Sequence, residues 1–402
     1  MIRFAIPPIG GKGWFGGWMY MRNLVRALAE YGDPRIENLL FLGPDRADDV
    51  DVRDLASLPR TRIVIDPAFA EDRVRGGIAR TLATGRNAAL LAAYAREGVQ
   101  VAFAPATYLG WRSEIASIAW FPDFQHRRMP DMFSRAAWWK RDIGFRAQVA
   151  SSAAILLSSE DAERDCLAAY PGARGRTRVA RFSVPVDSWP DADTAWARLR
   201  ADGIVEDFVF LPNQLWQHKN HALAIEAAGL LARRGSRRVI LATGHGEDPR
   251  RPEYRGELEA QISALGAGDH IRLLGSVDHS QVQSMMIGAN ALLNPSRFEG
   301  WSTTVEEGKA VGTPMLLSNL PVHREQAPTA RFFATDDAAA LANAVEGAAP
   351  RSLDEIRRAI EQARGATLDR QRAFAASVSR TILEVSSHRK PAKPIATKVE
   401  PA

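Results

Sequence analysis

Residues 293–314 combine two carboxylates with a candidate phosphate site. An apolar run typical of a buried strand ends in Glu299-Gly300, and a helix then opens on three hydroxyl side chains, Ser302, Thr303 and Thr304. The first N–H groups of a helix lack intrahelical partners and carry partial positive charge, so they favour phosphate oxygens. Glu307 falls in the second turn, about 12 Å from Glu299 if the segment is helical throughout. A ligand with hydroxyls at both ends and phosphate between them would fit this pattern.

The simplest alternative treats this segment as an amphipathic surface helix in which Glu306 and Glu307 are solvated charges. Such a helix needs only an apolar face and a polar face. That interpretation explains neither the Glu299-Gly300 pair nor the hydroxyls at the helix start, so we favour a ligand site.

The spacing of the two glutamates resembles a family signature. A Glu, seven intervening residues, a second Glu and a following Gly312-Thr313-Pro314 are similar to the pattern of the family 4 glycosyltransferases. This resemblance implies a retaining enzyme of the GT-B fold that uses a nucleotide-activated sugar. It also implies that Glu299 contacts the donor sugar and that Glu307 binds the ribose hydroxyls. Because the segment between them forms the predicted phosphate site at the helix start, donor binding is also assigned to Gly300, Trp301, Ser302, Thr303 and Thr304.

A second polar cluster occupies residues 211–221, after the first predicted strand of the second half. Ligands of doubly wound sheets bind at the carboxyl ends of the strands, so we predict that Lys219 binds the donor phosphate, with Asn213 beside it. The family usually carries an Arg five positions before this Lys, but Gln214 stands there, so one cation of the usual pair is missing. Arg297 is a candidate to supply that charge, since a guanidinium binds phosphate bidentately.

We predict no catalytic metal and no cofactor, and a nucleotide-diphosphate sugar as the donor substrate. His218 and His221 flank Lys219, but the only cysteine is Cys166 and no carboxylate is near, so hydrogen-bonding roles are favoured over metal ligation. An Asp-x-Asp match at residues 191–193 lies in the interdomain stretch rather than at a strand end, and we discount it.

A glycine-rich loop at residues 9–18 follows the first predicted strand and allows close approach of the backbone to a ligand. It matches a dinucleotide fingerprint only loosely, because no acidic residue follows at the expected distance, so a Rossmann dehydrogenase is the weaker interpretation. The family resemblance implies that Gly16-Gly17 lies against the donor diphosphate and the acceptor. A purely structural tight turn is the alternative.

Residues 120–130 follow another buried strand and are predicted to face the acceptor. Many family members carry His-Asp here, with a Pro eight positions after the His; Pro122-Asp123 and Pro130 stand in that register, so the Asp matches and the His does not. We predict acceptor-side roles for Asp123 and for His126, three residues later. The alternative for His126 is that it caps the following helix.

The order of elements predicts two domains. At 402 residues the chain exceeds what one core usually supports, and both halves alternate strand-like and helix-like segments. We therefore predict an α/β protein of two doubly wound, Rossmann-like parallel-sheet domains that face a cleft, the GT-B arrangement. The predicted parts are an acceptor-side domain (1–203), a nucleotide-sugar-binding domain (204–368), a helix returning to the first domain after a break near Gly365 (369–387) and a disordered tail (388–402).

The composition and charge of the chain limit the classes of binding partner that we expect. The net charge of +5 is dispersed, and no zinc-finger spacing or RNA-binding aromatic motif is present, so nucleic acid is not predicted as a partner. An anionic donor or an anionic membrane surface suits the charge equally well. The single cysteine and the lack of a long apolar run predict a cytoplasmic protein. Residues 133–149 carry tryptophans among basic residues, typical of an interfacial helix at the inner membrane face, although a core helix with charged edges is the favoured interpretation.

The resemblance thus predicts a retaining glycosyltransferase that moves a sugar from a nucleotide-diphosphate donor to a glycan or lipid-linked acceptor, in cell-surface polysaccharide or lipopolysaccharide synthesis. Lys219 and the helix N-terminus would neutralise the leaving phosphate while Glu299 holds the sugar. A sugar-nucleotide epimerase or synthase of the same fold, and a catalytically silent binding module, remain as alternatives.

Overall fold

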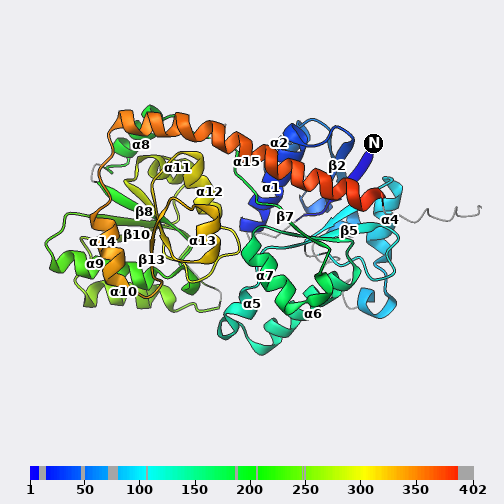
Figure 1. Cartoon of the computed structure of the whole chain (residues 1–402), viewed down its shortest axis with the longest axis horizontal. Coiled ribbons are helices and arrows are strands. Elements are labelled where there is room, and N and C mark those ends of the chain that lie inside the picture. Colours follow the sequence, from blue (N-terminus) through cyan, green and yellow to red (C-terminus); the bar gives the residue numbers. More distant parts are fainter. Residues whose placement is uncertain are drawn as a thin grey trace, which may run out of the picture.

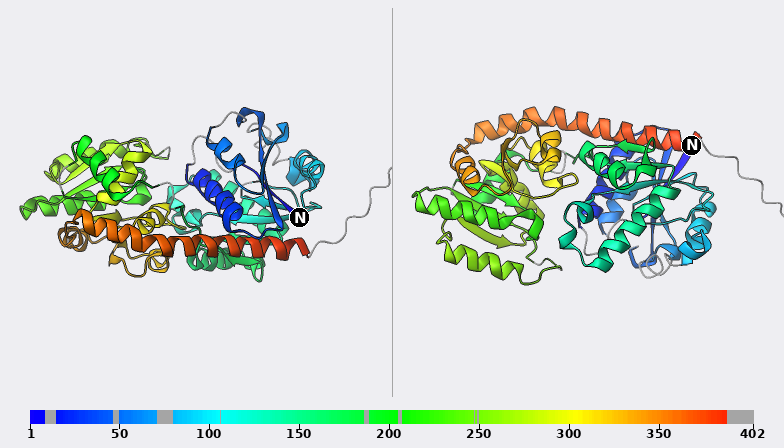
Figure 2. Two further views of the ribbon diagram at one scale, coloured as in Figure 1. Left: turned by 90° about the horizontal axis from the view of Figure 1, so that it is seen from above. Right: turned by 60° about the horizontal axis from the view of Figure 1, so that its bottom comes forward.

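The computed structural model describes residues 1–8, 15–46, 50–70, 80–105, 107–185, 189–204, 207–246, 248 and 250–387. Figure 1 shows two lobes side by side, with the long helix α15 (Leu353–Ser387) running across both, and both views of Figure 2 show the same arrangement. Most of the glycine-rich loop and the predicted tail at 388–402 lie outside the described residues.

The N-terminal lobe is built on a seven-stranded parallel sheet with strand order β3-β2-β1-β4-β5-β6-β7. Its strands are short apolar runs, as expected where helices cover both faces of a sheet. They are β1 (Ile2–Ile6), β2 (Ile36–Leu42), β3 (Thr61–Ile65), β4 (Val101–Ala104), β5 (Ala116–Phe121), β6 (Ala154–Leu157) and β7 (Thr177–Val179). The helices are α1 (Phe15–Tyr31), α2 (Val50–Ala56), α4 (Ala88–Arg96), α5 (Gln125–Arg128), α6 (Arg135–Ser151) and α7 (Glu160–Ala169). The next helix, α8 (Ala192–Ala201), packs on the C-terminal lobe beside α11 (His279–Gly288; Figure 1).

The C-terminal lobe repeats this plan with a six-stranded parallel sheet of order β10-β9-β8-β11-β12-β13. Its strands are β8 (Phe208–Pro212), β9 (Val239–Thr243), β10 (Ile271–Gly275), β11 (Ala291–Asn294), β12 (Met315–Ser318) and β13 (Arg331–Phe333). Its helices are α9 (His221–Arg233), α10 (Tyr254–Ala264), α11 (His279–Gly288), α12 (Thr303–Ala310), α13 (Pro321–Gln326) and α14 (Ala338–Glu346). In both sheets the strand order reverses beside the first strand, and ligands of doubly wound sheets bind at such reversals. The predicted fold class is confirmed.

Helix α15 ties the two lobes together. It begins with the capping box that the sequence contains, because Ser352 N donates to Glu355 Oε2 at 2.8 Å and Glu355 N donates to Ser352 Oγ at 3.3 Å. Its C-terminal half packs Phe374 and Ile382 into the core of the N-terminal lobe. The predicted break near Gly365 is wrong. A glycine in an exposed helix interior costs only about 1 kcal/mol relative to alanine, and α15 is held on either side of it by buried residues such as Ile356 and Phe374.

The segment predicted as an interfacial helix corresponds to α6. One side packs into the lobe, where the Trp138 indole N–H donates to the His126 carbonyl at 2.6 Å and Phe145 stacks on Phe121. The other side is open to solvent, with Trp139 54% exposed and Ile143 49% exposed. No helix in the described ranges has the length and apolarity needed to cross a membrane.

Candidate active site

A cavity lies between the two lobes, at the carboxyl ends of their central strands. The N-terminal lobe contributes the start of α1 and the segment after β5, and the C-terminal lobe contributes the ends of β8 and β11 and the start of α12. Most of the predicted site residues line it: Gly16, Asp123, Asn213, Gln214, Lys219, Glu299, Gly300, Trp301, Ser302, Thr303 and Thr304. The topology therefore brings together clusters that are far apart in the sequence.

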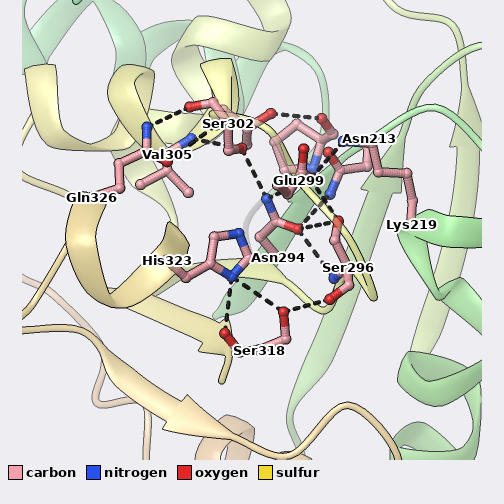
Figure 3. Close-up of polar contacts among 12 residues, drawn as sticks. Asn213, Lys219, Asn294, Ser296, Glu299, Ser302, Val305, Ser318, His323 and Gln326 are labelled. Atoms are coloured by element: carbon pink, nitrogen blue, oxygen red, sulfur yellow. Dashed lines mark hydrogen bonds and ion pairs between the residues drawn. The ribbon is translucent and has the colours of Figure 1, made fainter. Parts of the chain in front are cut away.

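The centre of the cavity is an ion pair. Lys219 Nζ lies 2.6 Å from Glu299 Oε1, and the two side chains are only 16% and 8% exposed (Figure 3). Burial alone would raise the pKa of Glu299, but the charge and hydrogen bond of Lys219 outweigh it and hold this pKa at about 2. Glu299 is therefore an anion, and Lys219 is its counter-ion while the cavity holds no other anion.

Two residues that the sequence analysis missed hold Glu299 in place. Ser296 Oγ lies 2.7 Å from Glu299 Oε1 and 2.6 Å from Asn294 Oδ1, so its single proton can be donated to either oxygen. Asn294 in turn donates through Nδ2 to Ser302 Oγ at 3.0 Å, which links the carboxylate to the start of α12 (Figure 3). Asn294 is the last residue of β11 and Ser296 lies just after it. Polar residues at the end of a buried strand are a sequence signal by which both could have been predicted.

The N-terminus of α12 is fixed from a separate segment. Ser302 is its N-cap, and its hydroxyl accepts from Val305 N. The Gln326 amide of α13 brackets the Ser302 backbone, accepting from its N–H at 3.1 Å and donating to its carbonyl at 2.8 Å. The cap is thus rigid, while the following N–H groups of Thr303 and Thr304 have no intrahelical partner and lie at the cavity.

Lys219 is positioned by the turn that carries it. Lys219 ends a short 3-10 helix (Gln217–Lys219), and Asn220 follows in the left-handed conformation with φ of 61°. Asn tolerates this region better than most residues. Asn220 Nδ2 donates to the carbonyls of Pro295 and Thr335, so the lysine loop is joined to the loop after β11. Burial lowers the pKa of neighbouring His218 to about 3, which makes it a neutral lining residue.

Asp123 lines the cavity from the N-terminal lobe, but His126 does not. The Asp123 carboxylate accepts from Arg141 at 2.6 Å and from the backbone N–H of Gln125 at 2.8 Å. His126 is 0% exposed, with Nε2 3.2 Å from the Tyr170 hydroxyl, and burial lowers its pKa to about 4. The prediction that His126 reaches the acceptor is wrong, because α5 turns it into the core.

Three other predicted residues lie off this cavity. Arg297 is exposed, and only its backbone N–H contacts the lysine loop, donating to the His218 carbonyl, so the structure does not support it as the replacement cation. Gly17 is buried in the first turn of α1, next to the lining Gly16. Glu307 is half-buried and lines a smaller neighbouring cavity, where burial raises its pKa to about 7.

Arg250 was not predicted from the sequence, yet it bridges the lobes beside the cavity. Its guanidinium lies 5.5 Å from the centre of the Trp216 ring and donates to Gln125 Oε1 at 3.4 Å. Trp216 and Gln125 both line the cavity.

Among the described residues, no group of three or more His, Cys, Asp or Glu side chains has the arrangement of a metal site.

The C-terminal lobe is similar in sequence to known proteins. Residues 205–365 match the family model described as Glycosyl transferases group 1. The D-inositol 3-phosphate glycosyltransferase of Jonesia denitrificans is 23% identical over 189 residues, which span 45% of this chain and 44% of that protein.

Solved structures share the whole architecture. A glycosyltransferase from Rickettsia africae superposes with a TM-score of 0.68 at 12% identity, over 96% of this chain and 98% of that one. Sucrose-phosphate synthase from Thermosynechococcus elongatus gives 0.66 at 19% identity, over 96% and 97%. Anabaena HepE in complex with UDP and glucose gives 0.63 at 14% identity, over 96% and 98%. Residues 205–365 therefore resemble the group 1 glycosyltransferases in sequence, and the chain as a whole has the GT-B fold.

Proposed function

We propose that this protein transfers a sugar from a nucleoside-diphosphate sugar to a hydroxyl group of a glycan or lipid-linked acceptor, with retention of anomeric configuration. The observation that carries the proposal is the buried Lys219–Glu299 pair beside the N-terminus of α12, in a cavity shared by both lobes. The structural similarity to HepE supports the donor class, since HepE was solved with UDP and glucose and with UDP-glucose.

Departure of a phosphate requires nearby positive charge, and two groups of this site can provide it. Negative charge builds on the leaving diphosphate as the anomeric bond breaks, and Lys219 and the N–H groups at the start of α12 stabilise that charge. When Lys219 binds the phosphate, it no longer donates a hydrogen bond to Glu299. The Glu299 carboxylate can then accept hydrogen bonds from the sugar hydroxyls. The departing phosphate oxygen removes the acceptor proton on the same face of the sugar, so the chain needs no separate base.

The proposal includes no metal and no cofactor, because Lys219 and the helix N-terminus supply the positive charge. We further propose that synthesis of a cell-surface polysaccharide or lipopolysaccharide is the setting, in the cytoplasm. The exposed Trp139 and Ile143 on α6, flanked by basic residues, support a peripheral contact with an anionic membrane.

Sugar nucleotides should raise the thermal midpoint of the protein. A ligand that binds only the folded state at 100 times its dissociation constant adds about 2.7 kcal/mol to the free energy of unfolding. Thermal unfolding with a panel of sugar nucleotides at millimolar concentration is the measurement, with the free sugars as controls. The absence of a shift with every sugar nucleotide would refute the proposal.

Donor binding should strengthen as the pH rises through 7. Burial raises the pKa of Glu307 to about 7, so its carboxyl is largely protonated below that pH and can then accept fewer hydrogen bonds from ribose hydroxyls. We expect roughly tenfold weaker binding of a sugar nucleotide at pH 6 than above pH 8, because each pH unit below the pKa removes about nine-tenths of the ionised form. The measurement is calorimetry with a sugar nucleotide, whose diphosphate does not titrate in this range.

The matched control for this pH dependence is Glu307→Gln, which should bind weakly and show a flat profile. A wild-type profile that is flat between pH 6 and 8 would remove Glu307 from the ribose site.

A further inference from the structure

A second cavity lies beside the candidate active site, and α1 forms one of its walls. Arg22, Asn23 and Arg26 of α1 line it on the side of the N-terminal lobe. Glu307 of α12 and His279 of α11 line it from the C-terminal lobe. It is therefore a cavity between lobes, like the active-site cavity.

The same two helices, α1 and α12, line both cavities. Helix α1 lines the first with Gly16 and Tyr20 and the second with Asn23 and its neighbours. Helix α12 lines the first with Thr303 and Thr304 and the second with Glu307. One helical turn covers about 5.4 Å, so the second cavity begins about one turn further along both helices. A donor whose diphosphate lies at the start of α12 would extend its nucleoside into the second cavity.

Donor groups without partners face this second cavity. Asn23 is 3% exposed, and its Nδ2 has no hydrogen-bond partner among the described residues; the same is true of the buried Nε of Arg26. A buried donor that lacks a partner costs about 1–3 kcal/mol, so these groups favour a ligand that offers acceptors. Glu307 is the only carboxylate among the described lining residues, although the charges of Glu30 and Asp54, which do not line the cavity, also stabilise charged Arg26.

We propose that α1 of the N-terminal lobe binds the nucleoside of the donor through Arg22 and Asn23, opposite Glu307. The inference rests on the proposed function and extends it, because it gives the N-terminal lobe a part in nucleotide selection as well as in acceptor binding. The side chains from α1 are hydrogen-bond donors, so they suit a base with carbonyl oxygens on its edge. The expected donors carry uracil, thymine or guanine rather than adenine.

The test compares nucleoside diphosphates with inorganic pyrophosphate, which can fill only the phosphate part of the site. Dissociation constants of the full-length protein are measured by calorimetry for UDP, dTDP, GDP, ADP and pyrophosphate. The variants are Arg22→Gln and Asn23→Ala, and the matched control is Arg233→Gln, at an exposed position in the last turn of α9. Thermal midpoints verify that each variant is folded.

We expect UDP, dTDP or GDP to bind wild type more tightly than ADP and pyrophosphate. Each α1 variant should weaken that nucleotide roughly 5- to 30-fold, the loss expected for one hydrogen bond to a ligand, and should change pyrophosphate binding less than twofold. The control should match wild type for every ligand.

Three results would overturn the inference. One is unchanged nucleotide affinity in both α1 variants, and another is an equal loss of nucleotide and pyrophosphate affinity, which would mean that α1 acts through the fold. The third is tightest binding of ADP. If wild type binds neither pyrophosphate nor any nucleotide, the proposed function itself fails, and this result differs from the other three.

Discussion

Replacing Lys219 by methionine should strongly reduce sugar transfer and also destabilise the protein. Methionine has a similar volume but no charge, so the leaving phosphate loses its counter-ion, and kcat/KM should fall by about 10²–10³-fold. The same change leaves Glu299 buried at 8% exposure with Ser296 and Asn294 as its remaining polar partners. Breaking a buried ion pair from one side leaves an uncompensated charge, so the free energy of unfolding should fall by roughly 3 kcal/mol.

The free energy of unfolding should change with pH in opposite directions in wild type and in Lys219→Met. In wild type the pKa of Glu299, about 2, lies below that of an unfolded glutamate. The ionised pair therefore stabilises the fold above pH 4.5, and this contribution is lost as the pH falls towards 2. Without Lys219, burial raises the pKa of Glu299 above its unfolded value. The variant should then be more stable at pH 5 than at pH 7.

A double variant separates the two effects. Lys219→Met with Glu299→Gln removes both charges, so it should recover most of the lost stability but none of the activity. Urea unfolding at pH 5 and 7, together with steady-state rates, measures this, and Lys140→Met on the exposed side of α6 is the matched control. If the single variant unfolds like wild type, the Lys219–Glu299 pair does not contribute to stability as described.

The sequence predicted the alternation of strands and helices, the two-sheet fold and most of the residues around the active-site cavity, because these depend on local patterns. Lys219 and Glu299 each follow a buried apolar strand, and the carboxyl ends of parallel strands lie along one edge. Their direct contact could not be predicted, since it depends on the register between β8 and β11 and on Asn220, which joins the two loops.

The errors have specific causes. His126 lies only three residues beyond Asp123, but its direction is set by Tyr170 and Asp142, which come from later segments of the lobe. Arg297 follows Ser296, whose hydroxyl already occupies the place beside Glu299, so the next side chain points out to solvent. Sequence proximity to a site residue does not determine which way a side chain points in an irregular loop.

Contacts between segments far apart in the chain also could not be predicted from local sequence patterns. Gln326, which fixes the cap of α12, belongs to α13, and β12 separates these two helices in the sequence. The second cavity depends on contact between α1 and the C-terminal lobe, so only the assembled domains reveal it.

Gly300→Ala should inactivate the protein by moving the lobes apart. A Cβ at this position would lie 2.1 Å from the Pro122 carbonyl oxygen and 2.9 Å from Asp123 Cβ, both in the opposite lobe. The segment cannot yield easily, because the Gly300 carbonyl accepts from Ser159 Oγ at 3.0 Å and the Trp301 indole N–H donates to the Phe182 carbonyl at 3.0 Å. The added methyl group must therefore shift backbone rather than a flexible side chain.

The expected consequence is a loss of transfer that exceeds the loss of phosphate binding. A misplacement of about 1 Å between reacting groups can cost about 10²-fold in rate, so kcat should fall at least that far. In the proposed site pyrophosphate binds Lys219 and the start of α12, both in the C-terminal lobe, so its dissociation constant should change little. Rates, pyrophosphate calorimetry and the radius of gyration in solution measure these effects. Gly256→Ala in α10, where a Cβ meets nothing within 4 Å, is the control. A Gly300→Ala protein with a near-normal rate would mean that transfer does not require this close approach of the lobes.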